Sequence, residues 1–478
     1  MQYGLIRGEI IPAIQVRKNY ILDHLTRLDR SCFRVTAASS NRALLFNRFL
    51  WKDYSNRIMD LSTANAPHIV KRCTGEMLTD SLVRSIELLL ERHDILNSSI
   101  EMAGGNLYLV RRTPKNMAFR EVMATGRTSQ EREDTGYRIA NDLVWEKYDL
   151  DDGPLYRVFL VRLSAVEYII GVALHHAIGD LISIGIMFHE LLSIYGSVVS
   201  GTMLRVPHMR LRYMDYLASM ESWSSGTDCE EYIRYWKHKL KATPVTDLLQ
   251  NGKPVSKRTI LGATAETKFR LDAETSHCLK KIAVQLRTTL FAMLLTVYKI
   301  ALLRMTRQDE LVVVALHAGR LDAGFQNAIG NFALEVAYKT SLAGNPGLAE
   351  IVGRIMCSMS EAHLCQPVPL DWVRRDLSEE GIQFYAPGIN FISGDTNHAH
   401  NPLGPRQLSF TPPGTRHGCH GFPVSCAIEL RDGSGGIEGS IVYRTDLYDE
   451  SIILAFINCF IQTVSDVNGF RREVLARQ

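Results

Sequence analysis

The sequence predicts an α/β protein built from two halves of similar style. Its 478 residues exceed the usual size of a single hydrophobic core. Strand-like apolar runs alternate with segments whose apolar residues recur at helical spacing, and this alternation occurs both before and after a polar stretch near 200–207. We therefore expect a first lobe over residues 33–205 and a second over 206–478. Residues 1–32 form an N-terminal extension without a strong pattern.

The first half contains a helix, two neighbouring strands and a second helix. Apolar residues at helical spacing predict one helix from Thr79 and another after His176. Residues 155–163 and 168–174 are typical of strands, and the short break between them predicts a hairpin or two adjacent strands. Gly201 marks the exit from the second helix. The apolar positions of the two helices are Leu82, Val83, Ile86, Leu89 and Leu90, and then Ile184, Met187, Phe188, Leu191, Ile194 and Tyr195.

The second half repeats this alternation of strands and helices. Thr289 is a suitable N-cap for a long apolar helix that runs to Arg304. Residues 394–421 are rich in Gly, Pro, His and Asn, which predicts a long loop. The other expected elements are a strand at 269–271, a helix from about Ala273, a strand at 311–316, a turn at 318–320, strands near 424–430 and 437–443, and a closing helix from about Glu450.

Composition and charge exclude several classes of function. With 54 basic and 51 acidic residues the net charge is only +3, which gives no reason to expect a nucleic-acid partner or an anionic membrane surface. The N-terminal residues lack the long apolar stretch of a secretory signal. The apolar run 290–303 is too short to span a bilayer and carries Lys299, so we expect a buried helix and no membrane association.

The cysteine and histidine pattern favours a cytoplasmic protein without a bound metal. The nine cysteines are an odd number with no repeated spacing, which fits a reducing cytosol. One local group, consisting of His417, Cys419, His420 and Cys426, lacks the paired-cysteine spacing of structural zinc sites and falls in the predicted loop. We therefore expect no metal site there.

The segment His175-His176-Ala-Ile-Gly-Asp180 lies where a buried strand ends and a loop leads into a helix. A histidine there can accept the proton that an amine or hydroxyl loses as it attacks a thioester. Neighbouring residues at a strand end point in different directions, so only one histidine can face a site. Asp180 could orient the imidazole or fix the loop through an arginine.

Other interpretations of the two histidines stay open from the residues alone. Both could be structural. A serine hydrolase would need a G-x-S-x-G turn, which the chain lacks. A metal site would need a third ligand, and His189 lies too far along the helix.

The order of short motifs resembles that of the condensation domains of nonribosomal peptide synthetases, in the superfamily that includes chloramphenicol acetyltransferase. Residues 175–183 match the family's HHxxxDGxS motif except at Leu181, where the family has glycine. The remaining matches are Glu91-Arg-His-Asp-Ile-Leu96 with RHExLR, Tyr213-Met-Asp-Tyr216 with YxDY, Ala318-Gly319-Arg320 with AGR, Ile329-Gly-Asn-Phe332 with IGxFVNT, Gln366-Pro-Val-Pro369 with HQDxPF, and Tyr443-Arg-Thr-Asp-Leu447 with YRTDLF.

The resemblance implies a role for each residue of the main motif. His176 would be the catalytic residue, as general base or as positioner of the nucleophile, and His175 a packed neighbour. Asp180 would be structural and would pair with Arg320 across the two lobes. The substrate channel would be lined by Gly179, Leu181 and Ser183.

The resemblance also implies a fold and partners. Two chloramphenicol-acetyltransferase-like lobes would form a V-shaped pair with a central tunnel, and the phosphopantetheine arm of a carrier protein would bring in the acyl thioester. No cofactor would be bound permanently. Because the resemblance takes up nearly the whole chain, we expect a free-standing enzyme that meets an acyl or peptidyl carrier protein in trans and acylates a small-molecule amine.

Two alternatives remain. The chain could form esters on an alcohol from a carrier-bound or CoA thioester, although the DFGWG segment of the plant CoA-dependent branch is absent. It could also be an inactive scaffold or recruitment module with the same fold, which departures such as Leu181 motivate.

Overall fold

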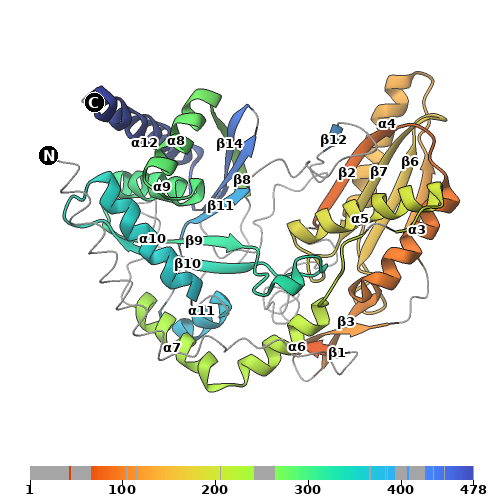
Figure 1. Cartoon of the computed structure of the whole chain (residues 1–478), viewed down its shortest axis with the longest axis horizontal. Helices are drawn as coiled ribbons and strands as arrows, with labels where there is room; N and C mark the ends of the chain where they lie inside the picture. The colour runs from red at the N-terminus through yellow and green to blue at the C-terminus, as the bar shows by residue number, and fades with distance from the viewer. Residues whose placement is uncertain are drawn as a thin grey trace.

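The computed structural model has the mixed α/β architecture that the sequence predicts (Figure 1). Two larger sheets lie toward opposite ends of the longest axis, and helices pack against both of them. The described residues are 42–44, 66–103, 106–112, 117–204, 206–241, 264–364, 368–382, 384, 386–392, 406–408, 426–433, 435–445 and 447–476.

The first large sheet has five strands, in the order β12-β2-β7-β6-β5. The predicted hairpin is confirmed, because β6 and β7 pair antiparallel with Tyr156 opposite Leu174. The strands are β2 (His68–Thr74), β5 (Phe119–Met123), β6 (Tyr156–Arg162), β7 (Glu167–Leu174) and β12 (Arg406–Leu408). A smaller sheet contains β1 (Arg42–Leu44), β3 (Ser98–Ala103) and β4 (Asn106–Arg111).

Both faces of this five-stranded sheet are covered, which explains why its central strands are apolar throughout. Val158 and Leu160 belong to the core cluster shared with α3 (Thr79–Arg92) and α5 (Leu181–Ser200). Phe159 and Val161, which alternate with them, pack on the other face with residues of α4 (Ser129–Trp145). A short 3₁₀ helix, η2 (Asp94–Asn97), follows α3.

The second large sheet has six strands, in the order β10-β9-β11-β13-β14-β8. Its strands are β8 (Thr264–Leu271), β9 (Glu310–His317), β10 (Leu334–Ser341), β11 (Gly388–Ile392), β13 (Cys426–Gly433) and β14 (Gly436–Arg444). The helices of this half are α6 (Tyr213–Ser224), α7 (Thr227–Lys241), α8 (Ala273–Gln285), α9 (Leu290–Thr306), α10 (Leu348–Leu364), α11 (Leu370–Glu379) and α12 (Glu450–Ala476), with a 3₁₀ turn η3 (Ala323–Phe325).

The prediction of a structureless loop over 394–421 is wrong at residues 406–408. These residues form β12, which adds to the edge of the first sheet by pairing antiparallel with β2. A three-residue strand is too short to show a hydrophobic period, so the sequence carries no signal for it. A segment from the second half thus completes a sheet of the first half, across the expected division at residue 205. The expected extension over 1–32 lies outside the described residues.

The apolar run around Lys299 is confirmed as a buried core helix. Thr289 caps α9 by accepting a hydrogen bond from the backbone N–H of Ala292 at 3.1 Å. Lys299 is fully buried, and its ammonium nitrogen donates to the carbonyl oxygen of Tyr338 and the hydroxyl of Thr340, both at 2.7 Å. The amino group of Lys299 is therefore hydrogen-bonded by the second sheet, and burial lowers its pKa well below the usual value.

Two helices, α5 and the first 20 residues of α12, are long and apolar enough to cross a membrane by length and composition alone. The bent pair of α8 and α9, which meet at 106°, passes the same test when taken as one span. In α5, 56% of the apolar window is buried inside the protein, so packing against the first sheet accounts for much of its apolar character. The expected absence of membrane association stays a prediction.

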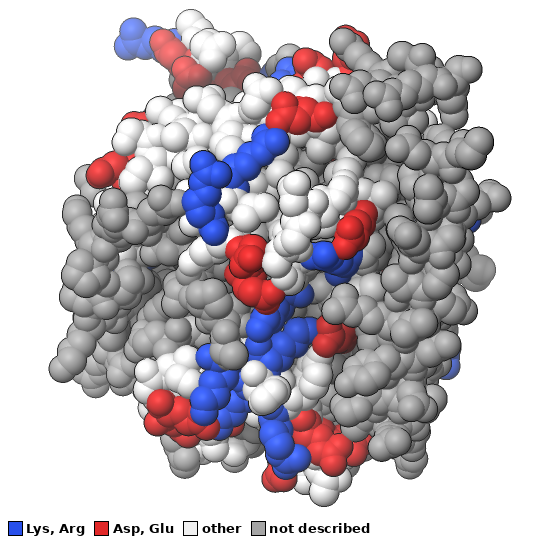
Figure 2. All heavy atoms as spheres, turned by 90° about the vertical axis from the view of Figure 1, so that its left-hand side faces the viewer, with Lys and Arg blue, Asp and Glu red and all other residues white. Residues whose placement is uncertain are grey.

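Charged side chains of both signs share the surface. Figure 2 shows one face of the molecule, on which lysine and arginine side chains are interleaved with aspartate and glutamate. This mixture agrees with the near-balance of 54 basic and 51 acidic residues.

Candidate active site

The two adjacent histidines lie in a tight turn between β7 and α5. After β7 ends at Leu174, the backbone N–H of Ile178 donates to the carbonyl oxygen of His175 at 3.0 Å. Asp180 then caps α5, because its Oδ1 accepts a hydrogen bond from the N–H of Ser183 at 2.8 Å. The turn and the cap together fix the backbone on both sides of His176.

The two imidazole rings have different surroundings. His175 is fully buried; its Nδ1 accepts a hydrogen bond from the N–H of Ala177 at 3.2 Å, and its ring meets the edge of Tyr148 at a centroid distance of 5.5 Å. His176 is only half-buried. His175 therefore packs inward, as the direction of neighbouring residues predicts, and His176 is the more exposed of the two rings.

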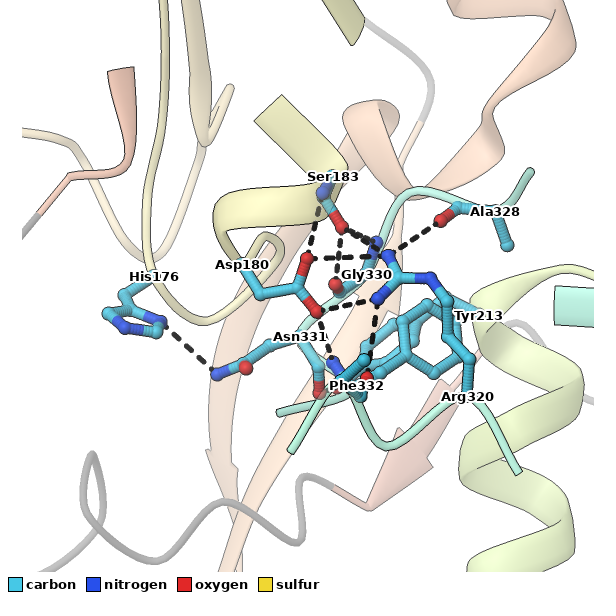
Figure 3. Close-up of polar contacts among 10 residues, drawn as sticks. His176, Asp180, Ser183, Tyr213, Arg320, Ala328, Gly330, Asn331 and Phe332 are labelled. Carbon is cyan, nitrogen blue, oxygen red and sulfur yellow. Dashed lines mark hydrogen bonds and ion pairs between the residues drawn. The ribbon is translucent and has the colours of Figure 1, made fainter. Parts of the chain in front are cut away.

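Asp180 and Arg320 form the ion pair that the motifs predict (Figure 3). The two guanidinium nitrogens lie 3.0 Å from Oδ2 and 3.3 Å from Oδ1, and both side chains are more than nine-tenths buried. The N–H of Phe332 donates to Oδ2 at 3.1 Å. A bidentate pair in this buried position fixes the α5 terminus to the loop after β9.

Ser183 belongs to the same buried group. Its hydroxyl donates to the carbonyl oxygen of Gly330 at 2.6 Å and accepts from the Gly330 N–H and an Arg320 nitrogen, both at 3.0 Å. With a fully buried side chain, Ser183 differs from the expectation that it lines a substrate channel, because its hydroxyl joins the two halves. We call Asp180, Ser183, Arg320 and the backbone of Gly330 and Phe332 the Asp180–Arg320 network.

Aromatic rings enclose this network. The Arg320 guanidinium lies 4.5 Å from the centroid of the Phe332 ring. Burial raises the pKa of the Tyr213 hydroxyl well above its usual value, and the nearby Tyr216 and Asp180 raise it further. Such a dry environment strengthens the attraction between Asp180 and Arg320.

Two glycines allow the segments of the second half around Arg320 to pack closely. Gly330 lies against the Tyr213 ring, where a Cβ would overlap the ring carbons. Gly319, in the AGR turn, has φ +62° and faces the carbonyl oxygen of Phe332, so a larger residue would be both strained and obstructed. These contacts explain why both motifs contain glycine.

The other two expected channel residues differ from each other. Gly179 is buried against Leu174, where it makes room for the turn after β7. Leu181 is 54% exposed at the first position of α5, and its neighbour Ile182 is 42% exposed. Leucine at the motif's glycine position therefore leaves the core unchanged and places apolar surface at the start of the helix.

Asn331 is a site residue that the sequence interpretation missed. Its amide nitrogen lies 3.2 Å from Nδ1 of His176, and the residue is only 6% exposed (Figure 3). The motif Ile329-Gly-Asn-Phe332 contained it, but at the position the family pattern leaves variable. No spacing rule connects two residues 155 positions apart.

The motif at 91–96 holds α3 against α5 rather than lining the site. Arg92 reaches Glu190 through two hydrogen bonds of 2.7 and 3.0 Å, and Nε2 of His93 lies 2.7 Å from the same carboxylate. Burial works to raise the pKa of Glu190, but these partners outweigh it and the net pKa is lowered. These contacts fix the end of α3 to the middle of α5.

The described residues contain no group of three or more His, Cys, Asp or Glu side chains able to hold a metal ion. His417, Cys419 and His420 lie outside the described part of the chain.

Comparison with known proteins decides the family. Residues 56–469 match the model of the family described as Condensation domain. The chain belongs to the condensation-domain family. Members of this family transfer acyl groups in nonribosomal peptide synthesis, and the resemblance inferred from the motifs is confirmed.

The relatives are parts of much larger proteins. The chain is 26% identical over 421 residues to one of the proteins of the linear gramicidin synthase of Brevibacillus parabrevis, a match that covers 87% of this chain and 5% of that protein. It is 23% identical over 446 residues to malpinin synthetase of Mortierella alpina, covering 92% of this chain and 6% of the relative. The chain therefore spans about a twentieth of the length of these relatives.

Solved structures share the fold. The X-domain from teicoplanin biosynthesis matches with a TM-score of 0.72 and 18% identity, covering 92% of this chain and 97% of that one. The first condensation domain of the calcium-dependent antibiotic synthetase, in complex with a substrate analogue, matches with a TM-score of 0.67 and 16% identity over 89% and 96% of the chains. The condensation-domain fold, with its chloramphenicol-acetyltransferase-like architecture, is thus established, whereas the V shape and the tunnel stay predictions.

Proposed function

We propose that this condensation domain joins an acyl thioester to an amine, with His176 as general base or as positioner of the nucleophile. The proposal rests on one observation: a half-buried imidazole lies at the junction of the two halves, next to a buried ion pair that fixes its turn. The family's acyl-transfer chemistry supports it.

The reaction needs one proton to move. The amine nitrogen attacks the thioester carbonyl carbon, the C–N bond forms and the C–S bond breaks. The proton lost by the nitrogen passes through His176 to the departing thiolate sulfur, so atoms and charge balance. The thioester would be carried by the phosphopantetheine arm of a carrier protein, and the protein itself would need no permanently bound cofactor.

A single substitution tests His176. Wild type and His176→Ala are incubated with an acyl-loaded carrier protein and a panel of free amines, and the amide product is quantified by mass spectrometry. We expect His176→Ala to lower the rate by roughly 10²- to 10⁴-fold while the thermal melting temperature stays the same, because only the proton acceptor is removed. The matched control is His277→Ala, on the exposed surface of α8. Unchanged turnover by His176→Ala would reject the proposal.

Two alternatives are separated by the same assay. Ester formation on an alcohol would use the same proton acceptor, so alcohols and acyl-CoA are offered beside the amines and the loaded carrier. An inactive scaffold is motivated by Leu181 at the motif's glycine position. Absence of product from wild type with every donor and acceptor would favour that scaffold.

A further inference from the structure

The side chain of Asn331 reaches His176 from the opposite half of the protein. His176 follows β7 of the first sheet, whereas Asn331 precedes β10 of the second. The amide nitrogen of Asn331 is 3.2 Å from Nδ1, and Figure 3 shows the other ring nitrogen turned away from this contact. Nδ1 is therefore the ring nitrogen in contact with Asn331, and Nε2 points in a different direction.

Hydrogen bonds to Asn331 and to both of its chain neighbours fix its backbone. Its carbonyl oxygen accepts a hydrogen bond from the Tyr213 hydroxyl at 3.0 Å. Its two chain neighbours, Gly330 and Phe332, both belong to the Asp180–Arg320 network. The ion pair thus fixes the position from which the amide side chain extends toward His176.

The amide can face the histidine in either of two orientations, which correspond to two tautomers of the ring. With the amide nitrogen toward Nδ1, the ring nitrogen accepts and the imidazole proton lies on Nε2. With the amide turned over, Oδ1 accepts a proton donated by Nδ1, and Nε2 carries the lone pair. In the first orientation, which Figure 3 draws, Oδ1 is buried and has no hydrogen-bond partner among the described residues.

A histidine that takes up a proton on Nε2 must already carry one on Nδ1. Once the second proton arrives, both ring nitrogens are donors, and only an acceptor can face Nδ1. The amide nitrogen would then oppose the protonated ring, whereas Oδ1 would bind it throughout the reaction. The orientation with Oδ1 toward the ring is thus the one compatible with proton transfer.

We propose that Asn331 is a positioning residue that presents Oδ1 to His176, holds the ring in its Nδ1–H tautomer and leaves Nε2 to accept the proton. This inference rests on the proposed function of His176. The amine's proton goes to Nε2 and returns from Nε2 to the thiolate sulfur, while the Nδ1 proton stays in its hydrogen bond with Asn331. The Asp180–Arg320 network therefore acts on the imidazole through Asn331.

The tautomer can be measured without any substrate. The full chain is labelled with ¹⁵N-histidine, and long-range ¹H–¹⁵N correlation spectra distinguish a protonated from an unprotonated ring nitrogen. His176→Gln assigns the signal among the 15 histidines. We expect wild-type His176 to be protonated on Nδ1. A wild-type ring protonated on Nε2 would overturn the inference.

Three variants test whether the side chain of Asn331 determines the tautomer of His176. Asn331→Asp keeps an acceptor oxygen, so we expect the same tautomer as in wild type. Asn331→Leu removes it, and the ring should lose its single tautomer. The matched control is Asn327→Leu in the same loop, whose amide donates to the carbonyl oxygen of His208 and not to His176. If Asn331→Leu does not fold, the comparison of wild type with Asn331→Asp still decides, because different tautomers in these two proteins would contradict the proposal.

Kinetics separate positioning from simple structural support. With the loaded carrier and amine used above, Asn331→Leu should lower kcat by about 10²-fold with little change in KM. In Asn331→Asp the carboxylate favours the protonated ring, so the acidic limb of the pH–rate profile should move to higher pH. An equal loss of kcat in both variants, without movement of that limb, would assign Asn331 a structural role only. A wild type with the Nδ1–H tautomer but no acyl transfer would instead reject the proposed function and leave the contact standing.

Discussion

At the scale of single residues, Leu181 is the main departure from the family motif. It is the first residue of α5, directly after the cap Asp180, and 54% of it is exposed. Glycine at this position would leave the backbone open, whereas leucine and the exposed Ile182 place apolar side chains shortly after His176 in the chain. We expect this apolar surface to restrict which acceptors approach the imidazole.

We predict that Leu181→Gly widens acceptor selectivity. The ratio of kcat/KM for a bulky amine to that for a small amine should rise about tenfold, because an obstructing side chain is removed. The free energy of unfolding should fall by less than about 1 kcal/mol, because this residue is the first of the helix and not an interior one. Val199→Gly, at the exposed far end of the same helix, should show the stability loss without the change in selectivity. Equal ratios in all three proteins would mean that Leu181 does not border the acceptor path.

Single residues were predictable where chemistry is local in the sequence. Asp180 and Arg320 were paired correctly because both lie in recognisable motifs, and His175 was assigned inward because strand neighbours alternate. Asn331 was missed because its significance comes from a contact across 155 residues. Ser183 was assigned to the channel, although its hydroxyl joins the halves, because one sequence does not show which side of a helix terminus faces its partner.

At the scale of elements, helix α5 begins with a cap that also joins the two sheets. Asp180 accepts from the N–H of Ser183, as an ordinary N-cap does, and also binds Arg320 from the other half. Asp272 caps α8 in the same manner, by accepting from the N–H of Thr275 at 2.7 Å, but it is exposed. The two caps differ mainly in the buried ion pair.

This difference allows the ion pair to be measured. We predict that Asp180→Ala lowers the free energy of unfolding by about 3–5 kcal/mol, since it leaves the Arg320 charge buried without its partner. Asp272→Ala should cause a much smaller loss, that of a cap alone. Urea denaturation of both variants gives the comparison. Similar losses in the two variants would show that the ion pair with Arg320 adds no stability to that of the cap. Full stability of Asp180→Ala together with lost activity would instead make Asp180 catalytic.

Elements were predictable in proportion to their length and periodicity. The helices at 79–92 and 290–306 bury a continuous apolar face, so their spacing alone identified them. Strand β12 has three residues and depends on an edge provided by β2, far away in the sequence. Short strands that exist only through a distant partner cannot be recognised from local pattern.

At the scale of the whole molecule, contacts far apart in the chain join the two halves, and two of them involve the sheets or the site directly. The Asp180–Arg320 network joins the α5 terminus to the loop before β10, and β12 joins a late segment of the chain to the first sheet. The sequence predicted two similar α/β halves, but not that a strand from the second half would join the sheet of the first. The free energy of unfolding of the whole chain should therefore report on titrating groups near either sheet.

His317 is such a group, at the end of β9 in the second sheet. Its Nε2 contacts the Tyr338 hydroxyl, and its ring lies 5.9 Å from that of His363 and 6.5 Å from that of Phe291. Burial, with a further contribution from His363, lowers the pKa of His317 from 6.5 to about 4. The folded protein therefore holds this ring neutral at pH values where the unfolded chain protonates it.

We predict that His317 makes the protein less stable in mild acid. Below pH 6.5 the unfolded state binds a proton that the native state does not, so the free energy of unfolding falls as the pH drops toward 4. Between about pH 7.5 and about pH 5 the loss should be about 2 kcal/mol. His317→Gln removes the titrating ring, so its urea midpoint should fall less over the same interval, whereas His277→Gln on the exposed surface of α8 should behave as wild type. Parallel curves for wild type and His317→Gln would show that the imidazole already binds its proton in the folded protein.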